Sequence, residues 1–119
     1  MDGKVSKWFK RKELECKCGC GEYIHNQELL DVLDDVREHF GVPVIINSST
    51  RCKVHNAEIG GALASQHLLG TAADIVVKGM EPSKVADYIE EEHETRYGIG
   101  RYKNFTHIDV RNWKARWNG

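Results

Sequence analysis

Apolar residues recur at helical spacing between Asn26 and Phe40, and this is the most regular pattern in the chain. The Asn26 side chain can accept a backbone N–H and so cap the start of a helix, while Gly41 is suited to end it. The sequence therefore predicts an amphipathic helix over residues 26–40. Its apolar stripe consists of Leu29, Leu30, Val32, Leu33, Val36 and Phe40.

Shorter elements follow this helix. Residues 42–49, VPVIINSS, predict a strand, because they are β-branched and are bounded by Gly41 and a polar turn. Residues 51–59 predict a short helix that must stop at the glycine pair 60–61, and residues 62–70 predict a loop. A second strand is expected over 72–77, and a second long helix is expected from Glu81, Pro82 and Ser83 into the acidic segment 90–94.

The last part of the chain has three short strand-like segments, at 96–102, 105–110 and 114–117, separated by turn residues. This spacing is typical of an antiparallel meander. Helices and strands that do not alternate strictly indicate the α+β class. We therefore predict one α+β domain over residues 1–119, with helices packed on a small antiparallel sheet.

Composition and charge reduce the classes of partner that we expect for this chain. The chain has 119 residues, a formal net charge of -1 and an isoelectric point near 6.6, which gives no overall attraction to nucleic acid. No apolar run approaches the roughly 20 residues of a membrane helix, and the first fifteen residues lack the apolar centre of a signal peptide. We expect no nucleic-acid partner, no membrane partner and synthesis in the cytoplasm without an export signal. The oligomeric state stays open.

Asp74 is the residue that calls for a chemical explanation. It lies within an apolar predicted strand, where an ionised carboxylate without a partner costs several kcal/mol. A salt bridge to an arginine, or a position at the end of the strand, would satisfy it. A metal ion would also satisfy it.

Two histidines favour the metal. His107 lies in the apolar segment HIDV, and His67 lies seven positions before Asp74, with Gly70 between them to permit a sharp turn. Either histidine alone is more often a structural residue than a ligand. Together, two imidazoles and one carboxylate at the edge of the sheet would form a three-ligand site suited to one Zn²⁺ per chain, with a fourth position for water or substrate.

These residues also carry a family resemblance. SQHLLGTAAD, residues 65–74, resembles the SxHxxGxAxD signature of the zinc D-alanyl-D-alanine carboxypeptidases and the related phage endolysin peptidases. THIDVR, residues 106–111, resembles the strand that completes their metal site. The similarity extends from residue 9 to residue 117 and implies a hedgehog-like or DD-peptidase-like fold, with Zn²⁺ ligands at His67, Asp74 and His107.

The resemblance implies further roles. Arg51 would bind a carboxylate or carbonyl of the substrate and help to stabilise the oxyanion, although an exposed arginine at a helix start is the ordinary reading of its position. Ser65 and Gln66 match the signature and would bind substrate or pack the loop. Asp109 should share a strand face with His107, where it is either the catalytic base or a carboxylate that orients a ligand.

One position departs from the family pattern. Better-known relatives carry an acidic residue three positions before the last zinc histidine, or a histidine two positions before it. This chain has Asn104 and Phe105 there, and neither can act as a base. His55 and Tyr102 are weaker candidates for that role.

The resemblance implies a zinc metallopeptidase that hydrolyses an amide bond in the peptide part of bacterial peptidoglycan, as a D-alanyl-D-alanine carboxypeptidase or an endopeptidase. It also implies a phage or prophage association, with delivery to the cell wall by a lysis system or a virion. The alternative is a zinc-binding module without turnover that binds cell wall or a protein partner.

The four cysteines do not match the CxxC pairs of zinc ribbons. Cys16, Cys18 and Cys20 alternate in CKCGCG, and Cys52 follows much later. Reduced thiols, a disulfide to Cys52 and a second metal site are all compatible with this spacing.

Overall fold

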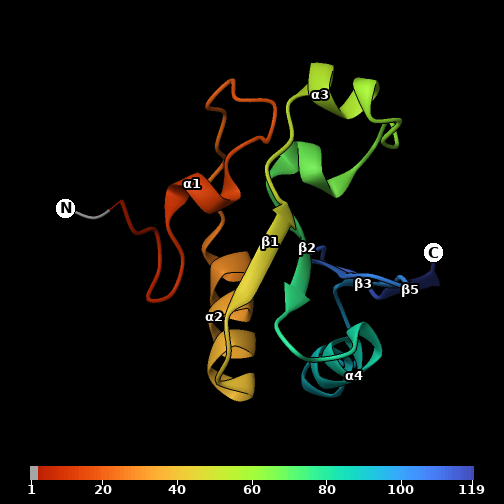
Figure 1. The fold of residues 1–119 in the computed structure, drawn as a ribbon. Coiled ribbons are helices and arrows are strands. Elements are labelled where there is room, and N and C mark those ends of the chain that lie inside the picture. Colours follow the sequence, from red (N-terminus) through yellow and green to blue (C-terminus); the bar gives the residue numbers. More distant parts are fainter. Residues whose placement is uncertain (1–2) are drawn as a thin grey trace.

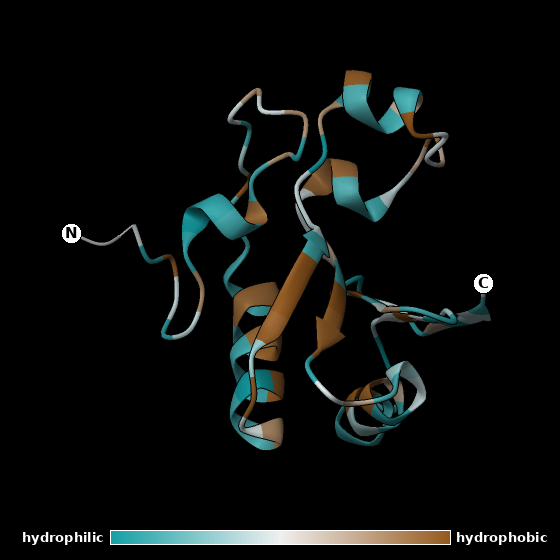
Figure 2. Cartoon of the chain, in the orientation of Figure 1, coloured by the Kyte–Doolittle hydropathy of each residue, from teal (hydrophilic) through white to brown (hydrophobic). Residues whose placement is uncertain are grey.

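The computed structural model describes residues 3–119, and its longest helix, α2, spans Gln27–Phe40. The predicted caps are confirmed, because the Asn26 side chain accepts a hydrogen bond from the Leu29 N–H and Gly41 has a left-handed φ of 68°. One side of α2 is apolar and the other hydrophilic (Figure 2). The residues at its two ends therefore determine where this helix begins and stops.

The sheet has five strands in the order β1-β2-β4-β3-β5. β1 (Val44–Ser48), β2 (Ala72–Val77), β4 (Thr106–Asp109) and β3 (Gly98–Arg101) pair antiparallel, each with the next in that order. β5 (Ala115–Asn118) pairs with β3 in parallel. The α+β class is confirmed, and the sheet is mixed.

The predicted antiparallel meander is therefore wrong in its last strand. β4 already pairs with β2 on one edge and with β3 on the other. The chain that leaves β4 can extend the sheet on this side only at the outer edge of β3, and there it runs parallel to β3.

The helices cover one face of this sheet. α2 packs against β2, and α4 (Pro82–Glu92) packs against β2, β3 and β4 (Figure 1). Their buried side chains share one core cluster with Ile75 of β2 and Ile108 of β4. Because successive side chains on a strand alternate between faces, Asp74 and His107 project from the opposite face.

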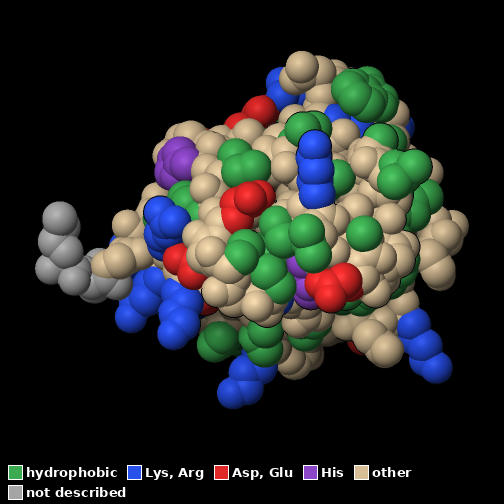
Figure 3. Space-filling model, turned by 90° about the horizontal axis from the view of Figure 1, so that it is seen from above, with side chains coloured by type: hydrophobic (Ala, Val, Ile, Leu, Met, Phe, Trp, Pro, Cys, Tyr) green, Lys and Arg blue, Asp and Glu red, His purple; other side chains and the backbone are tan. Residues whose placement is uncertain are grey.

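The remaining elements are short. α1 (Arg11–Leu14) was not anticipated, α3 (Lys53–Glu58) confirms the predicted short helix, and the predicted loop contains the 3-10 turn η1 (Gln66–Leu69). α3 and the loop after it lie at the top of Figure 1, and Figure 3 views the molecule from that side, where apolar and charged side chains are mixed.

The predicted domain of residues 1–119 includes residues 1 and 2, which lie outside the described part of the chain. Within residues 3–119, none of the helices combines the length and the apolar character that crossing a bilayer requires.

Candidate metal centre and active site

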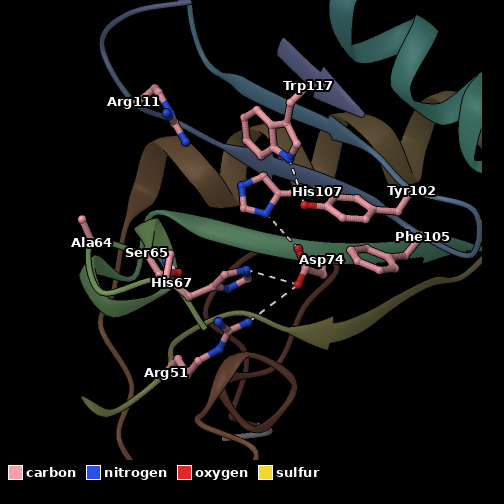
Figure 4. Close-up of a pocket in the computed structure, with 11 residues that line it drawn as sticks. Arg51, Ala64, Ser65, His67, Asp74, Tyr102, Phe105, His107, Arg111 and Trp117 are labelled. Atoms are coloured by element: carbon pink, nitrogen blue, oxygen red, sulfur yellow. Dashed lines mark hydrogen bonds and ion pairs between the residues drawn. The ribbon is translucent and has the colours of Figure 1, made fainter. Parts of the chain in front are cut away.

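Asp74 and His107 are direct cross-strand partners in the β2–β4 pair. Asp74 Oδ1 lies 2.9 Å from His107 Nδ1 (Figure 4). Antiparallel pairing holds the Cα atoms of opposite residues about 4.5–5.5 Å apart, so the sheet itself sets their separation. We expected these groups at the sheet edge, but β2 and β4 are interior strands and the two side chains lie on the face of the sheet.

His67 comes from η1, in the loop before β2. The Ser65 hydroxyl accepts a hydrogen bond from the His67 N–H, and Gly70 ends the turn with a φ of 72°. A Cβ on Gly70 would approach the Ile24 side chain to 2.5 Å, so this turn needs glycine for space as well as for conformation. The turn aims His67 Nε2 at Asp74 Oδ2, 3.2 Å away.

The outer nitrogens of both imidazoles are also held. His67 Nδ1 lies 2.8 Å from the carbonyl oxygen of Ser49, and His107 Nε2 lies 2.8 Å from Asp109 Oδ2. Since a carbonyl and a carboxylate only accept, these nitrogens donate. The nitrogens that face Asp74 are therefore Nε2 of His67 and Nδ1 of His107, in the orientation that metal-binding histidines need.

The charges in this cluster are strongly coupled. Burial disfavours ionisation of Asp74, but hydrogen bonds from His107 and His67 hold its pKa well below its usual range. Burial alone would lower the pKa of His107, yet its bonds to Asp109 and Asp74 leave that pKa above its ordinary value. The cluster is thus a partly buried carboxylate that attracts positive charge.

The donor set fits Zn²⁺. One atom each from His67, Asp74 and His107 lies within 4.8 Å of the others, and two imidazoles with one carboxylate are ligands that zinc uses in sites with an open fourth position. The structure brings the three predicted ligands together.

Arg51 is buried and reaches the same carboxylate. Its Nη2 lies 3.8 Å from Asp74 Oδ2, while Nη1 donates to Asn56 Oδ1 at 2.9 Å and Nη2 donates to Ser48 Oγ at 3.2 Å. Burial lowers the pKa of Arg51, and the charge of Asp74 opposes that effect. The arginine contact considered from sequence therefore exists, although it is longer than either imidazole contact.

Asp109 lies behind His107. Its side chain is fully buried, and both oxygens accept from Arg111, Oδ1 from Nε and Oδ2 from Nη2, each at 2.7 Å. Burial opposes ionisation, but the bonds from Arg111 and His107 hold the pKa of Asp109 well below its usual range. Its contacts suit the orienting role considered from sequence better than that of a base, because a base needs a lone pair in reach of substrate.

A cavity of about 370 Å³ opens over the cluster. Ser65 lines it, whereas Gln66 accepts a hydrogen bond from the Thr71 hydroxyl at 2.8 Å and, in the described chain, does not line the cavity. Of the two weaker candidates for the base, Tyr102 lines the cavity, where it stacks on Phe105 with ring centroids 4.4 Å apart. Among the described lining residues, His55 and Asn104 are absent.

The sequence did not place Trp117 or Arg111 in this site. Both line the cavity, and Trp117 Nε1 donates to the Tyr102 hydroxyl at 2.9 Å. The parallel β3–β5 pairing sets Trp117 opposite Gly100, where a Cβ would approach the indole nitrogen to 2.6 Å. Gly100, which leaves room for the Trp117 ring, was the sequence signal for this contact. It could not be used without knowing that β3 and β5 are neighbours.

The comparison with known families agrees with the geometry. The family model for peptidase M15 matches residues 7–109, which run from before α1 to the end of β4 and include all three predicted ligands. The chain belongs to the peptidase M15 family. The family resemblance seen in the sequence is thereby confirmed, and as an M15 member the protein is a metallopeptidase of a zinc-dependent family. A search of curated proteins finds no match for this M15 peptidase.

Proposed function

We propose that this M15 peptidase uses one Zn²⁺ to hydrolyse an amide bond in the peptide part of bacterial peptidoglycan, either removing a terminal D-alanine or cutting within the stem or cross-bridge. The observation that carries the proposal is the placement of His67, Asp74 and His107 at the wall of a cavity that also receives Arg51. The family match supports the reaction class, and the resemblance to the D-alanyl-D-alanine carboxypeptidases supports the substrate class.

His67 Nε2, Asp74 and His107 Nδ1 would hold the ion. When bound there, Zn²⁺ supplies Lewis-acid polarisation of a carbonyl and activation of water near neutral pH. The chain's own contribution is orientation, because the Ser49 carbonyl and the Asp109 carboxylate fix the two imidazole rings. We assign Asp109 this positioning role.

Arg51 supplies a fixed positive charge beside the ligands. Asn56 and Ser48 hold its guanidinium in place, so it needs no reordering when a substrate arrives. In this position it suits a substrate carboxylate or the oxygen on which negative charge develops. Ser65, on the same cavity wall, offers a small polar contact for the peptide.

The similarity to phage endolysin peptidases supports a further proposal, that the protein reaches the cell wall through a phage lysis system or a virion.

The rival function is a zinc-binding module that binds cell wall or a protein partner without turnover. It rests on Asn104 and Phe105, which cannot act as a base and stand where better-known relatives carry an acidic residue or a histidine.

The test is incubation of the protein with purified peptidoglycan fragments of known stem and cross-bridge, followed by mass spectrometry. We expect products whose mass identifies the cleaved bond, loss of those products with a chelator, and recovery on addition of Zn²⁺. His67→Ala should be inactive, and Val54→Ala, on the exposed face of α3, is the matched control. Intact fragments from protein shown to contain zinc would favour the module instead.

A further inference from the structure

The four cysteines gather in one place, apart from the histidine site. Cys16, Cys18 and Cys20 lie in the segment between α1 and α2, and Cys52 caps the start of α3. Their Sγ atoms all lie within 4.8 Å of one another, with 3.4 Å between Cys16 and Cys18 and 3.8 Å between Cys18 and Cys52.

The loop conformation explains how alternating cysteines can converge. In an extended chain, residues two apart are separated by about 6.6 Å, which would spread three thiols too widely for one ion. Here residues 17–20 form a turn, and the Gly19 N–H donates to the Cys16 carbonyl at 3.3 Å. The Cys16 N–H donates to the Glu22 carbonyl at 2.9 Å and closes the loop. Gly19 and Gly21 have φ of 88° and 81°, a conformation that side chains disfavour.

The spacing of the thiols suits a tetrahedral ion. A Zn–S bond of about 2.3 Å in a tetrahedron places the sulfur atoms roughly 3.8 Å apart. We propose that Cys16, Cys18, Cys20 and Cys52 form a second metal site that binds Zn²⁺ through four thiolates. Thiolate sulfur is a soft ligand that selects zinc over the hard cations, and a site with all four positions filled by protein is structural.

Backbone donors support thiolates in this cluster. The Cys52 N–H donates to Cys16 Sγ, and the His55 N–H donates to Cys52 Sγ, both at 3.4 Å. Although burial opposes ionisation of Cys16, hydrogen bonds from Cys52 and Cys18 lower the pKa of its thiol to about 7, whereas the contacts of Cys18 with the neighbouring thiols raise its own pKa. The protein therefore already contains donors that would stabilise the negative charge that metal ligation requires.

Such a site would join the N-terminal segment to the active site. Cys52 follows Arg51, whose backbone N–H donates to the His67 carbonyl at 3.0 Å. On the other side, the Thr50 N–H donates to the Leu14 carbonyl at 3.1 Å and the Thr50 hydroxyl accepts from the Ile24 N–H at 3.0 Å. A tetrathiolate centre would stabilise these contacts next to Arg51, which lines the cavity.

The first experiment measures zinc per chain in full-length protein purified without chelators. We expect two zinc ions in the wild type, one in His67→Ala and one in the double variant Cys18→Ser, Cys20→Ser. After replacement by Co²⁺, the thiolate-to-metal charge-transfer absorption should persist in His67→Ala and vanish in the cysteine variant. This reciprocal loss assigns each ion to its own site. A single zinc ion in the wild type that His67→Ala removes would overturn the proposal.

A second measurement keeps the proposal testable if the cysteine variant does not fold. Cys18 and Cys20 are exposed, so uncoordinated thiols there would react at once with a thiol reagent in the native wild type. We expect slow reaction that a strong chelator accelerates, with four thiols titrated per chain after denaturation in chelator. Immediate reaction without chelator would indicate plain reduced cysteines and overturn the site. Fewer than four thiols after denaturation would indicate a disulfide, with the same consequence.

Discussion

Asp109→Asn tests the contact that orients His107. The substitution keeps the shape of the side chain and removes its charge, so it creates no cavity. The wild-type carboxylate is fully buried and accepts charge-assisted hydrogen bonds of 2.7, 2.7 and 2.8 Å from Arg111 and His107. At the Oδ1 position the amide NH₂ group would meet Arg111 Nε, and at the Oδ2 position it would meet both Arg111 Nη2 and His107 Nε2.

If the NH₂ group faces His107, that nitrogen becomes an acceptor and the ring proton moves to Nδ1, the nitrogen that faces Asp74. In either orientation the amide is neutral, so the ion pair with Arg111 is lost. Removing one member of a buried ion pair costs about 3–5 kcal/mol. The Arg111 side chain is 18% exposed and can recover part of its hydration, so we expect a loss of about 2–3 kcal/mol in the free energy of unfolding.

Chelator-treated wild type and variant should be compared by urea unfolding, and their zinc affinities by competition with a chromophoric chelator. Loss of a residue that orients a metal ligand weakens binding about 10–100-fold, so zinc should still load at micromolar concentration while turnover falls strongly. Asp87→Asn is the control, because that carboxylate pairs with Arg101 at the surface and its loss should change stability by about 0.5 kcal/mol or less. Unchanged stability, zinc affinity and turnover in Asp109→Asn would refute the orienting role.

Two further substitutions probe the same region. Arg51→Lys keeps the charge, but a compact ammonium lacks the planar fork that spreads donors toward Asn56, Ser48 and a substrate oxygen at once. A hydrogen bond to a charged group contributes about 1.5–3 kcal/mol, so kcat/KM on peptidoglycan fragments should fall about tenfold or more. An unchanged value would exclude Arg51 from substrate binding. Gly98→Ala would place a Cβ 2.3 Å from Asp109 Oδ2, and such overpacking costs about 1–3 kcal/mol, so its melting temperature should fall by several degrees; wild-type melting would show that this packing is loose.

The elements that could be predicted from sequence are those with local signals. α2 carries both of its caps in its own sequence, and β2 is a short, mostly apolar run whose bounds match the prediction. β5 shows the limit, because its parallel pairing depends on which strand edge is still open after β4 has paired on both sides. Four-residue elements such as α1 and η1 contain too few residues for periodicity to indicate them.

The residues of the site also divide into those that the sequence could predict and those that it could not. Residue type and the resemblance indicated His67, Asp74 and His107, since a carboxylate in an apolar strand needs a counter-charge. The parts that escaped prediction depend on three-dimensional pairing. Arg111 turns back onto Asp109, two residues earlier in the chain, and Trp117 reaches the cavity only through the β3–β5 register. The convergence of the cysteines depends on a turn whose geometry the alternating pattern does not reveal.

The origin of the three ligands has a consequence for local opening of the fold. Asp74 and His107 are held by an interior strand pair, and separating them would require the sheet to come apart. His67 stands on a short turn between the loop after α3 and β2, and segments of this kind open at much lower free energy than core strands. Two of the three ligands, Asp74 and His107, are therefore fixed by the sheet, and only His67 stands on a segment that can open locally. Exchange of an ion would proceed through excursions of the His67 turn, on a timescale set by that loop, while the sheet stays closed.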